Sequence, residues 1–291
     1  MYLLSYFKES AEQFFLAGSM DGLHYTEWNG GLPLHISGIG TGRIRDPFLL
    51  IDSRGRYHLL WTDGWNSRSI GYASSLDLKQ WENEQLIPLM EHLPETQNVW
   101  APEAYYDSAC EAYRIVWSST IGAGPRNHRI WSVTTKDFVS FSPAELFFDP
   151  GYNVIDASIA DTGSGYLMLF KDERGSNVQG TEYKAIRSCP VYSTSDGTVT
   201  FGPISELLTP ALTEGPTLYE LSVSHASSYR WIMLADGFQD ASYTVMGSAD
   251  LEHWQQIPAA EITLPPGLRH ASVLRLPERF VQSLEKEGIH K

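Results

Sequence analysis

Four carboxylate residues and one histidine recur along this sequence at nearly even spacing, each at the start of a short apolar run. They are Asp46, Glu103, Asp156, Glu214 and His270. The intervals between them are 57, 53, 58 and 56 residues. Carboxyl groups that are brought together serve as general acids and general bases, or as ligands of a cation. The spacing therefore indicates one site that is assembled from five similar segments.

The residues that follow these acids fix the backbone at the start of each apolar run. Gly215 and Pro216 follow Glu214, and Pro47 follows Asp46. Glycine lets another group approach the chain closely, and proline suits the first residue of a strand because it has no N–H to donate within a sheet. Each acid is therefore predicted to lie at the mouth of a strand.

A second motif repeats in register with the first: a Ser or Thr, an Asp two residues later, and an aromatic residue four or five positions after the Asp. Its aspartates are Asp21, Asp77, Asp137, Asp196 and Asp250. Aspartate stabilises tight turns by accepting hydrogen bonds from the backbone, so we interpret these five as structural residues. Two motifs that each occur five times at a period of about 55 residues predict five structural repeats.

Within each repeat the pattern is four short strands separated by turn residues. The first repeat shows apolar runs at 48–51, 57–61 and 69–74, followed by a run from 81 towards 88. Four strands in about 50 residues are the content of one propeller blade. The sequence therefore predicts an all-β protein that folds as a five-bladed β-propeller.

The two ends of the chain predict how the ring closes. Residues 2–7 and 14–19 supply strands but no opening strand that carries an acid, whereas residues 270–276 supply only an opening strand. We therefore expect the N- and C-terminal strands to pair within one blade. Residues 1–277 then form a single five-bladed catalytic domain, and residues 278–291 form a short C-terminal tail that is predicted to be helical.

Composition limits the classes of partner. The 291-residue chain has 21 basic and 35 acidic side chains, which gives a formal charge of −14. This argues against a nucleic acid or an anionic membrane as partner and is compatible with an uncharged ligand such as a sugar. We expect no signal peptide and no membrane-spanning helix, and we expect Cys110 and Cys189 to form no disulfide framework. We expect a cytoplasmic protein with reduced thiols, and its oligomeric state stays open.

The first strand of each propeller blade lines the central channel, so the five motif residues should face one funnel. Carboxylates in one concave place repel each other, which costs stability and favours protonation of at least one. Cleavage of a glycosidic bond needs one protonated and one ionised carboxyl group at the same pH. Repulsion from Asp156 would keep Glu214 protonated, while Asp46, which has Arg43 and Arg45 nearby in the sequence, would stay ionised and activate water.

Four segments at these strand mouths carry a family pattern. They are Arg45-Asp46-Pro47, Trp100-Ala101-Pro102-Glu103, Ile155-Asp156-Ala157-Ser158 and Glu214-Gly215-Pro216. The combination, which extends over residues 1–277, resembles the signature of glycoside hydrolase family 43, the five-bladed arabinofuranosidases and xylosidases. The resemblance implies inverting hydrolysis, with Asp46 as general base, Glu214 as general acid and Asp156 as the residue that tunes and orients the acid.

The resemblance has implications for the channel axis and for substrate range as well. It implies that His270 binds a metal ion, such as calcium, or an ordered water, and that no cofactor is required. Ala157 stands where the family often has proline, which is a minor difference. We expect no C-terminal β-sandwich; because that domain often closes the pocket in the family, its absence leaves the substrate range open.

Five residues are candidates for substrate binding: Trp100, Glu103, Arg45, Trp61 and Arg269. Trp61 and Trp100 lie near strand mouths or ends, where an indole ring can stack on a sugar, whereas Trp117 is interpreted as core. Glu103 either binds substrate or pairs with an arginine. The run Lys171-Asp172-Glu173 ends a predicted strand, and it either lines the pocket or lies on a solvated loop.

The leading functional hypothesis is an inverting exo-glycosidase that hydrolyses short arabino- or xylo-oligosaccharides, as an α-L-arabinofuranosidase or a β-xylosidase does. One alternative is a glycoside phosphorylase on a related propeller, for which Arg43 and Arg45 are the candidate phosphate ligands. Another alternative is a non-catalytic propeller that binds sugars or proteins, against which the acid cluster argues. The sugar, its anomer and its linkage stay open.

Overall fold

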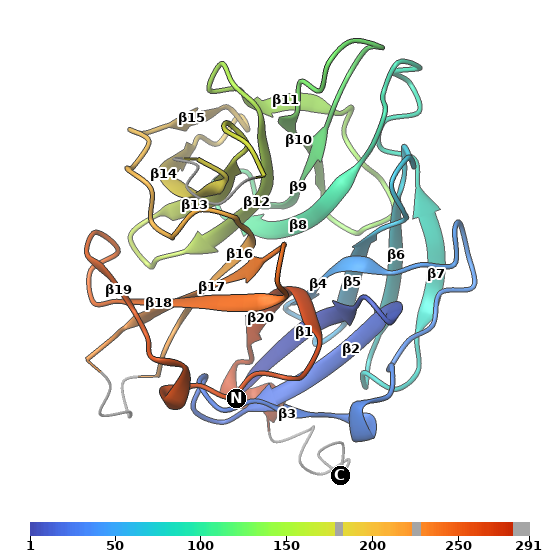
Figure 1. Ribbon diagram of the computed structural model, residues 1–291. Helices are drawn as coiled ribbons and strands as arrows, with labels where there is room; N and C mark the ends of the chain where they lie inside the picture. Colours follow the sequence, from blue (N-terminus) through green and yellow to red (C-terminus); the bar gives the residue numbers. More distant parts are fainter. Residues whose placement is uncertain (178–182, 223–227, 282–291) are drawn as a thin grey trace.

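The computed structural model describes residues 1–177, 183–222 and 228–281. It contains five four-stranded antiparallel sheets arranged in a ring (Figure 1), which confirms the five-bladed β-propeller. Two short 3₁₀ helices, η1 (Asn29–Gly31) and η2 (Ala259–Glu261), lie in connections. No helix among the described residues is long and apolar enough to cross a membrane.

Each blade takes its strands in chain order from the axis outwards, except the blade that contains both ends of the chain. The first two blades consist of β4 (Arg45–Ile51), β5 (Tyr57–Thr62), β6 (Ile70–Ser75) and β7 (Glu82–Ile87), and of β8 (Trp100–Asp107), β9 (Ala112–Ser119), β10 (Arg129–Thr135) and β11 (Glu145–Phe148). The next two consist of β12 (Val154–Asp161), β13 (Tyr166–Asp172), β14 (Ala185–Ser193) and β15 (Val199–Phe201), and of β16 (Thr213–Glu220), β17 (Trp231–Gly237), β18 (Ser242–Ser248) and β19 (Trp254–Gln256).

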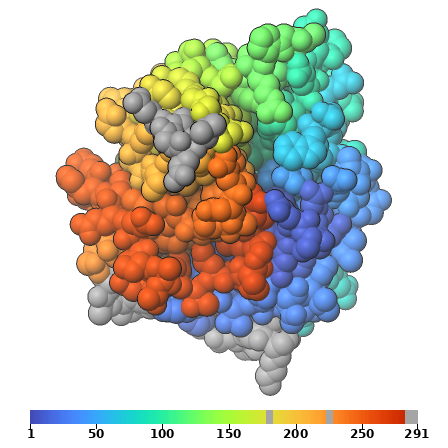
Figure 2. Space-filling model, viewed as in Figure 1, coloured from blue at the N-terminus to red at the C-terminus, as the bar shows by residue number. Residues whose placement is uncertain are grey.

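The fifth blade closes the ring as the sequence predicts. Its order is β20 (Leu268–Arg275), β1 (Tyr2–Lys8), β2 (Ala11–Ser19) and β3 (Thr26–Glu27). β1 pairs with β20 in antiparallel register, with Tyr2 opposite Arg275 and Lys8 opposite Leu268. In Figure 2 the blue N-terminal segment accordingly lies directly against the orange and red C-terminal segments. Residues 278–281 are helical, and the rest of the predicted helical tail lies outside the described residues.

The core lies between adjacent blades rather than at the centre of the ring. β5 is buried along its whole length because blades cover both of its faces. Trp61 on β5 and Trp117 on β9 are both fully buried, each within a cluster of apolar side chains from neighbouring strands. This packing holds the five inner strands in contact around the axis: β4 with β8, β8 with β12, β12 with β16, β16 with β20, and β20 with β4.

Every inner strand has a β-bulge near its first residues. In β4, for example, Arg45 pairs with Thr62 and Phe48 pairs with Leu60, so two residues of β4 oppose one residue of β5. The first residue of each bulge has a left-handed backbone: Asp46 (φ 49°), Ala101 (φ 48°), Asp156 (φ 57°), Gly215 (φ 53°) and His270 (φ 36°). For residues other than glycine this conformation costs about 1–2 kcal/mol, and such strain is commonly found at functional sites.

The bulges correct the residue equivalence expected from the sequence. Glu103 and Glu214 were aligned with Asp46, but the structurally equivalent residues are Ala101 and Gly215. Glu214 lies one residue before its bulge position, and Glu103 lies two residues after it. The difference matters because Glu214 lies nearer the start of its strand than Asp46 does and Glu103 lies further along its strand, so the three side chains leave the inner strands at different heights along the axis.

Candidate active site

A cavity of about 400 Å³ opens at the end of the axis where the inner strands begin. We call it the axial cavity. It is lined by Glu9, Arg45, Asp46, Thr62, Trp65, Trp100, Arg126, Ile155, Asp156, Lys171, Glu173, Asn177, Lys184, Glu214, Phe238, Arg269 and His270. All three predicted catalytic acids are among these residues, together with four of the six other predicted site residues: Arg45, Trp100, Arg269 and His270.

Eight of the seventeen lining residues belong to two rings of equivalent residues. The residues immediately before each bulge position all reach the cavity: Arg45, Trp100, Ile155, Glu214 and Arg269. Of the bulge residues themselves, the three with functional side chains reach it: Asp46, Asp156 and His270. The propeller therefore places one acid from the first ring and two from the second around the same small space.

The Asp46 carboxylate is fixed at both oxygens. The Thr62 hydroxyl donates a hydrogen bond to Oδ2 at 2.7 Å, and His270 Nδ1 lies 3.3 Å from Oδ1. Thr62 Oγ1 also accepts a hydrogen bond from the backbone N–H of Ala101 at 2.7 Å. Because the hydroxyl has one proton, and it is directed to Asp46, the carboxylate orientation is set by the backbone of the next blade.

Asp156 is almost completely buried at the cavity wall. Burial raises its pKa to about 7; the negative charges of Glu214 and Asp46 act in the same direction, against the charges of His270 and Lys171. Its Oδ2 accepts a hydrogen bond from the backbone N–H of Gly215 at 3.1 Å. Asp156 is therefore tied to the strand that carries Glu214, and it readily takes up a proton near neutral pH.

Glu214 belongs to a chain of alternating charges. Its Oε2 accepts a hydrogen bond from Lys171 Nζ at 2.7 Å, and the same Nζ lies 2.6 Å from Glu173 Oε1. Glu173 Oε2 pairs in turn with Lys184 at 2.7 Å. The Lys171 side chain is only 4% exposed, and its Nζ lies 4.1 Å from the centre of the Phe238 ring. The sequence expectation that repulsion from Asp156 controls Glu214 therefore omitted its nearest charged neighbour.

His270 is surrounded by carboxylates, whose charges favour its protonated form. Burial lowers its pKa, but the charges of Asp46, Asp156, Glu214 and Glu103 outweigh this and leave the pKa raised. A protonated imidazole has no lone pair for a metal ion. Among the residues that the structure describes, no group of three or more His, Cys, Asp or Glu side chains is placed to hold one. A single histidine whose shell is completed by waters would form no such group, so the axial role of His270, as a ligand of a metal ion or of an ordered water, stays a prediction.

Two arginines of the lining are held by acids. Arg269 Nε pairs with the buried Asp236 at 2.8 Å, and its Nη1 pairs with Glu9. Arg45 pairs with Glu12 at 2.5 Å, and its guanidinium lies 4.7 Å from the Phe7 ring and 4.5 Å from the Trp65 ring. Both guanidinium groups are thus fixed at the cavity wall, where Arg45 also contacts the Phe7 and Trp65 rings.

Trp100 forms an aromatic wall of the cavity. Its ring lies edge-on to Trp65, with 5.5 Å between the ring centres, and its Nε1 donates to the Trp65 carbonyl at 3.0 Å. The Arg126 guanidinium lies 5.2 Å from the same ring. Trp100 is therefore fixed at the cavity wall, and its stacking on a sugar stays a prediction.

Two predicted substrate contacts are not at the cavity. Trp61 is fully buried in the apolar cluster between the fifth blade and the blade β4–β7, so its ring does not reach a ligand there. Glu103 is buried within the channel near Ser158, and burial raises its pKa to about 8. It is absent from the cavity lining because it lies two residues past its bulge position, and the arginine partner considered from the sequence is absent among the contacts described.

Sequence reasoning missed Thr62 and left Lys171 undecided. Both residues lie on second strands and pair with the residue just before a bulge: Thr62 with Arg45, and Lys171 with Ile155. Ser118 and Asp236 occupy the same position in two other blades. Knowledge of this register would have found all four residues, but the position has no common residue type that a sequence pattern reveals.

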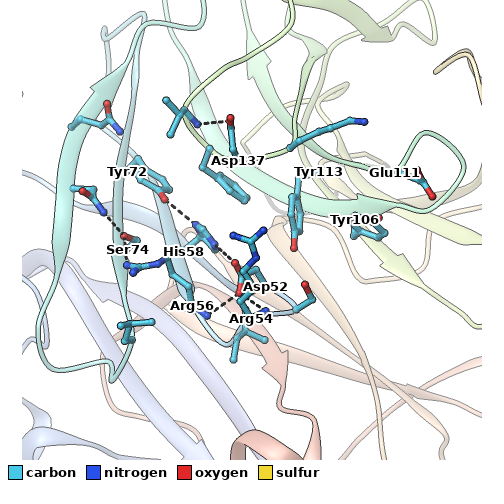
Figure 3. Close-up of a pocket in the computed structure, with 18 residues that line it drawn as sticks. Asp52, Arg54, Arg56, His58, Tyr72, Ser74, Tyr106, Glu111, Tyr113 and Asp137 are labelled. Carbon is cyan, nitrogen blue, oxygen red and sulfur yellow. Dashed lines mark hydrogen bonds and ion pairs between the residues drawn. The ribbon is translucent and has the colours of Figure 1, made fainter.

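A larger hollow of about 1040 Å³ lies between the blades β4–β7 and β8–β11 (Figure 3). At its centre His58 Nδ1 contacts the Tyr72 hydroxyl at 2.9 Å, its Nε2 lies 3.6 Å from Asp52, and its ring stacks on Phe138. Burial lowers the pKa of His58 to about 4. These groups hold one another, so we interpret this hollow as a packing groove between blades and place the candidate chemistry in the axial cavity.

Comparison with known proteins agrees with this geometry. A family model described as a probable glycosyl hydrolase domain, related to glycoside hydrolase family 43, matches residues 1–279. The chain belongs to this glycosyl hydrolase family. The family resemblance noted in the sequence and the expectation that the protein is a glycoside hydrolase are thereby confirmed.

Individual relatives cover parts of the chain. An α-L-arabinofuranosidase of Bifidobacterium longum subsp. longum is 28% identical over 177 residues, which are 50% of this chain but 17% of that longer protein. The arabinanase Arb43A of Bacillus subtilis has a TM-score of 0.52 at 16% identity, with 78% of each chain covered. The β-xylosidase RS223 has a TM-score of 0.57 at 11% identity, with 74% of this chain and 77% of that chain covered. At these identities the two structures show the shared fold alone.

Proposed function

We propose that this glycoside hydrolase is an inverting exo-enzyme that cleaves short arabino- or xylo-oligosaccharides, in the manner of an α-L-arabinofuranosidase or a β-xylosidase. The observation that carries the proposal is that Asp46, Asp156 and Glu214 converge from three blades on one cavity of about 400 Å³. A space of this size suits the terminal sugar of a chain better than the middle of a polymer. The similarity to an α-L-arabinofuranosidase over half of the chain supports the substrate class.

In the proposed mechanism Asp46 is the general base. Thr62 and His270 hold its carboxylate, and the raised pKa of His270 favours a cationic imidazole beside it. Asp46 takes a proton from a water molecule as the water oxygen attacks the anomeric carbon on the face opposite the leaving group. Glu214 donates its proton to the glycosidic oxygen as the bond between carbon and oxygen breaks.

Asp156 has a supporting role in this scheme. It accepts the N–H of Gly215 and so fixes the backbone from which Glu214 extends. No step requires a cofactor or a metal ion. The arginines proposed as phosphate ligands for a phosphorylase are both engaged by Glu12, Arg43 at 3.1 Å and Arg45 at 2.5 Å, which favours hydrolysis over phosphorolysis.

A panel of aryl glycosides tests the proposal: arabinofuranoside, xyloside and galactoside, each with and without inorganic phosphate. We expect turnover of an arabinofuranoside or a xyloside that does not depend on phosphate. Proton NMR of the first-formed product from the active substrate should show inversion at the anomeric carbon. Retention would overturn the mechanism, phosphate dependence would indicate a phosphorylase, and sugar binding without turnover of any glycoside would indicate a non-catalytic propeller.

A further inference from the structure

The contact between Lys171 and Glu214 presents a chemical problem for the proposed mechanism. A general acid must hold a proton before it can donate one, but a cation at 2.7 Å favours the ionised carboxylate. Lys171 is enclosed, with 4% of its side chain exposed, so water screens its charge little. A lysine that faced Glu214 alone would therefore hinder acid catalysis.

Glu173 changes this balance. It binds Lys171 Nζ at 2.6 Å, as closely as Glu214 does, and its other oxygen binds Lys184 at 2.7 Å. Burial raises the pKa of Glu173, but the charges of Lys171 and Lys184 outweigh burial and leave the pKa lowered. The two lysines thus favour the anionic form of Glu173, and this anion gives Lys171 a counter-charge in addition to Glu214.

We propose that Lys171 is a positioning residue for Glu214, and that Glu173 is the counter-charge that allows Glu214 to be protonated again after each turnover. The inference rests on the proposed function, because it concerns how the acid of that mechanism is held. In each cycle the Glu214 proton goes to the leaving oxygen, and the resulting carboxylate is stabilised by Lys171. A proton from solvent then restores the acid, which Glu173 makes possible by sharing the lysine charge.

Other charged and titratable groups also face Glu214, and they come from several strands. They are Asp156 on β12, Lys171 on β13, Asp236 on β17, Tyr243 on β18, and Arg269 and His270 on β20. Asp236 and Arg269 pair with each other at 2.8 Å, and His270 pairs with Asp46 at 3.3 Å. Among the residues that the structure describes, Lys171 is the cation that contacts the Glu214 carboxylate directly, so its removal should have an effect that the other groups do not replace.

The decisive variants are Lys171→Met, Lys171→Arg and Glu173→Gln in the full chain. Methionine has an unbranched side chain of similar length and removes the charge. Lys8→Met is a matched control outside the cavity, because Lys8 also pairs with a carboxylate, Glu27, at 2.7 Å and lies 4.8 Å from the centre of an aromatic ring. Thermal unfolding of each variant establishes that it folds.

The kinetic readout compares two leaving groups on the same sugar, a disaccharide and a nitrophenyl glycoside. For Lys171→Met we expect kcat on the disaccharide to fall about tenfold or more, with a much smaller loss on the nitrophenyl glycoside, which needs little protonation. KM should change little, and Lys171→Arg should restore part of the loss. Equal losses on both substrates, or no loss, would reduce Lys171 to a structural residue and overturn the proposal.

Titration of Glu214 provides a readout that does not require turnover. The carboxyl ¹³C signal of Glu214 can be followed in glutamate-labelled protein and assigned by its absence in Glu214→Gln. Its titration midpoint should move to higher pH in Lys171→Met and to lower pH in Glu173→Gln, with no movement in Lys8→Met. Equal midpoints in all variants would overturn the inference. If the unmodified protein cleaved no glycoside, the proposed function would fail, while these midpoints would still show whether Lys171 and Glu173 control the protonation of Glu214.

Discussion

The two ends of the propeller use acidic residues differently. At the end opposite the axial cavity, the five aspartates of the repeated turn motif stabilise the turns that lead to the outermost strands. At the cavity end, Asp46, Asp156 and Glu214 converge on the axis. Asp137 illustrates the turn group: its Oδ1 accepts the backbone N–H groups of Val139 and Ser140 at 2.9 and 2.8 Å. These bonds lower its pKa, as similar bonds lower the pKa values of the other four turn aspartates. Asp156 instead accepts one backbone N–H, and burial raises its pKa to about 7.

The difference shows how burial and the supply of local donors set apart two kinds of acid in a repeat protein. Both groups recur at the same period, so periodicity alone does not separate them. Turn aspartates are satisfied by local donors within three residues, and they are ionised at any neutral pH. Asp156 and Glu103 lack such local donors and are buried. Burial raises the pKa of Asp156 to about 7 and that of Glu103 to about 8, and ionising either group inside the fold costs stability.

Removal of the base or the acid should have the largest effect. Asp46→Asn and Glu214→Gln should each lose about 10²–10⁴-fold in kcat on an unactivated disaccharide, with little change in Tm. An activated aryl leaving group should rescue Glu214→Gln far more than Asp46→Asn, because it departs without a proton. The matched change at the other end, Asp137→Asn, should leave kcat unchanged. Full activity of Glu214→Gln on the disaccharide would remove its role as the acid.

The stability of Asp156→Asn should reveal the cost of a buried acid. The folded-state pKa of Asp156, about 7, exceeds its unfolded value, so the acid form stabilises the fold at low pH and this contribution is lost as pH rises from about 4 to 7. Asparagine can still accept the Gly215 N–H and has no charge to bury. The variant should therefore gain stability over the parent across this range, by on the order of 2–4 kcal/mol at pH 8. Denaturant unfolding at pH 5 and pH 8 measures the gain, and a variant less stable at pH 8 would contradict it.

The fold was predictable because its signal is distributed over the whole chain. Two motifs present five times each indicated five blades, and the incomplete ends indicated the closure that β1 and β20 make. The details of the site were less predictable. The bulges shift Glu103 into the channel, and Trp61, near a strand end, turns into the core between blades. Lys171 reaches Glu214 across 43 residues of sequence, a contact that only the stacking of two blades creates.

Loss of the Thr62 hydroxyl should have an intermediate effect on catalysis. Thr62→Val keeps the shape of the side chain but leaves Asp46 Oδ2 without its 2.7 Å hydrogen bond and the Ala101 N–H without an acceptor. We expect kcat to fall about tenfold, the equivalent of about 1.4 kcal/mol, on disaccharide and aryl glycoside alike, because the base serves both. Thr62→Ser should restore most of the activity. If kcat fell only on the disaccharide, whose leaving group needs a proton, Thr62 would instead support the general acid Glu214.

The smallest effect should come from the substitution of a turn aspartate. Asp77→Ala should lower the stability of the fold, whereas Asp156→Asn should raise it. Asp77 accepts the N–H groups of Lys79 and Gln80, each at 2.8 Å. Burial acts to raise its pKa, but these bonds and that of Ser75 outweigh it, so the pKa is lowered and the ionised form stabilises the fold at pH values above about 4. Asp77→Ala should therefore cost about 1 kcal/mol at pH 7, a fall in Tm of about 2–4 °C, and the deficit should shrink as pH falls through the pKa of Asp77. Thermal unfolding of Asp77→Ala, Asp156→Asn and the parent between pH 3 and pH 8 compares the two effects as changes in Tm. If both variants shifted Tm in the same direction at pH 8, the distinction between the two ends of the propeller would fail, because both acids would then have the same energetic role.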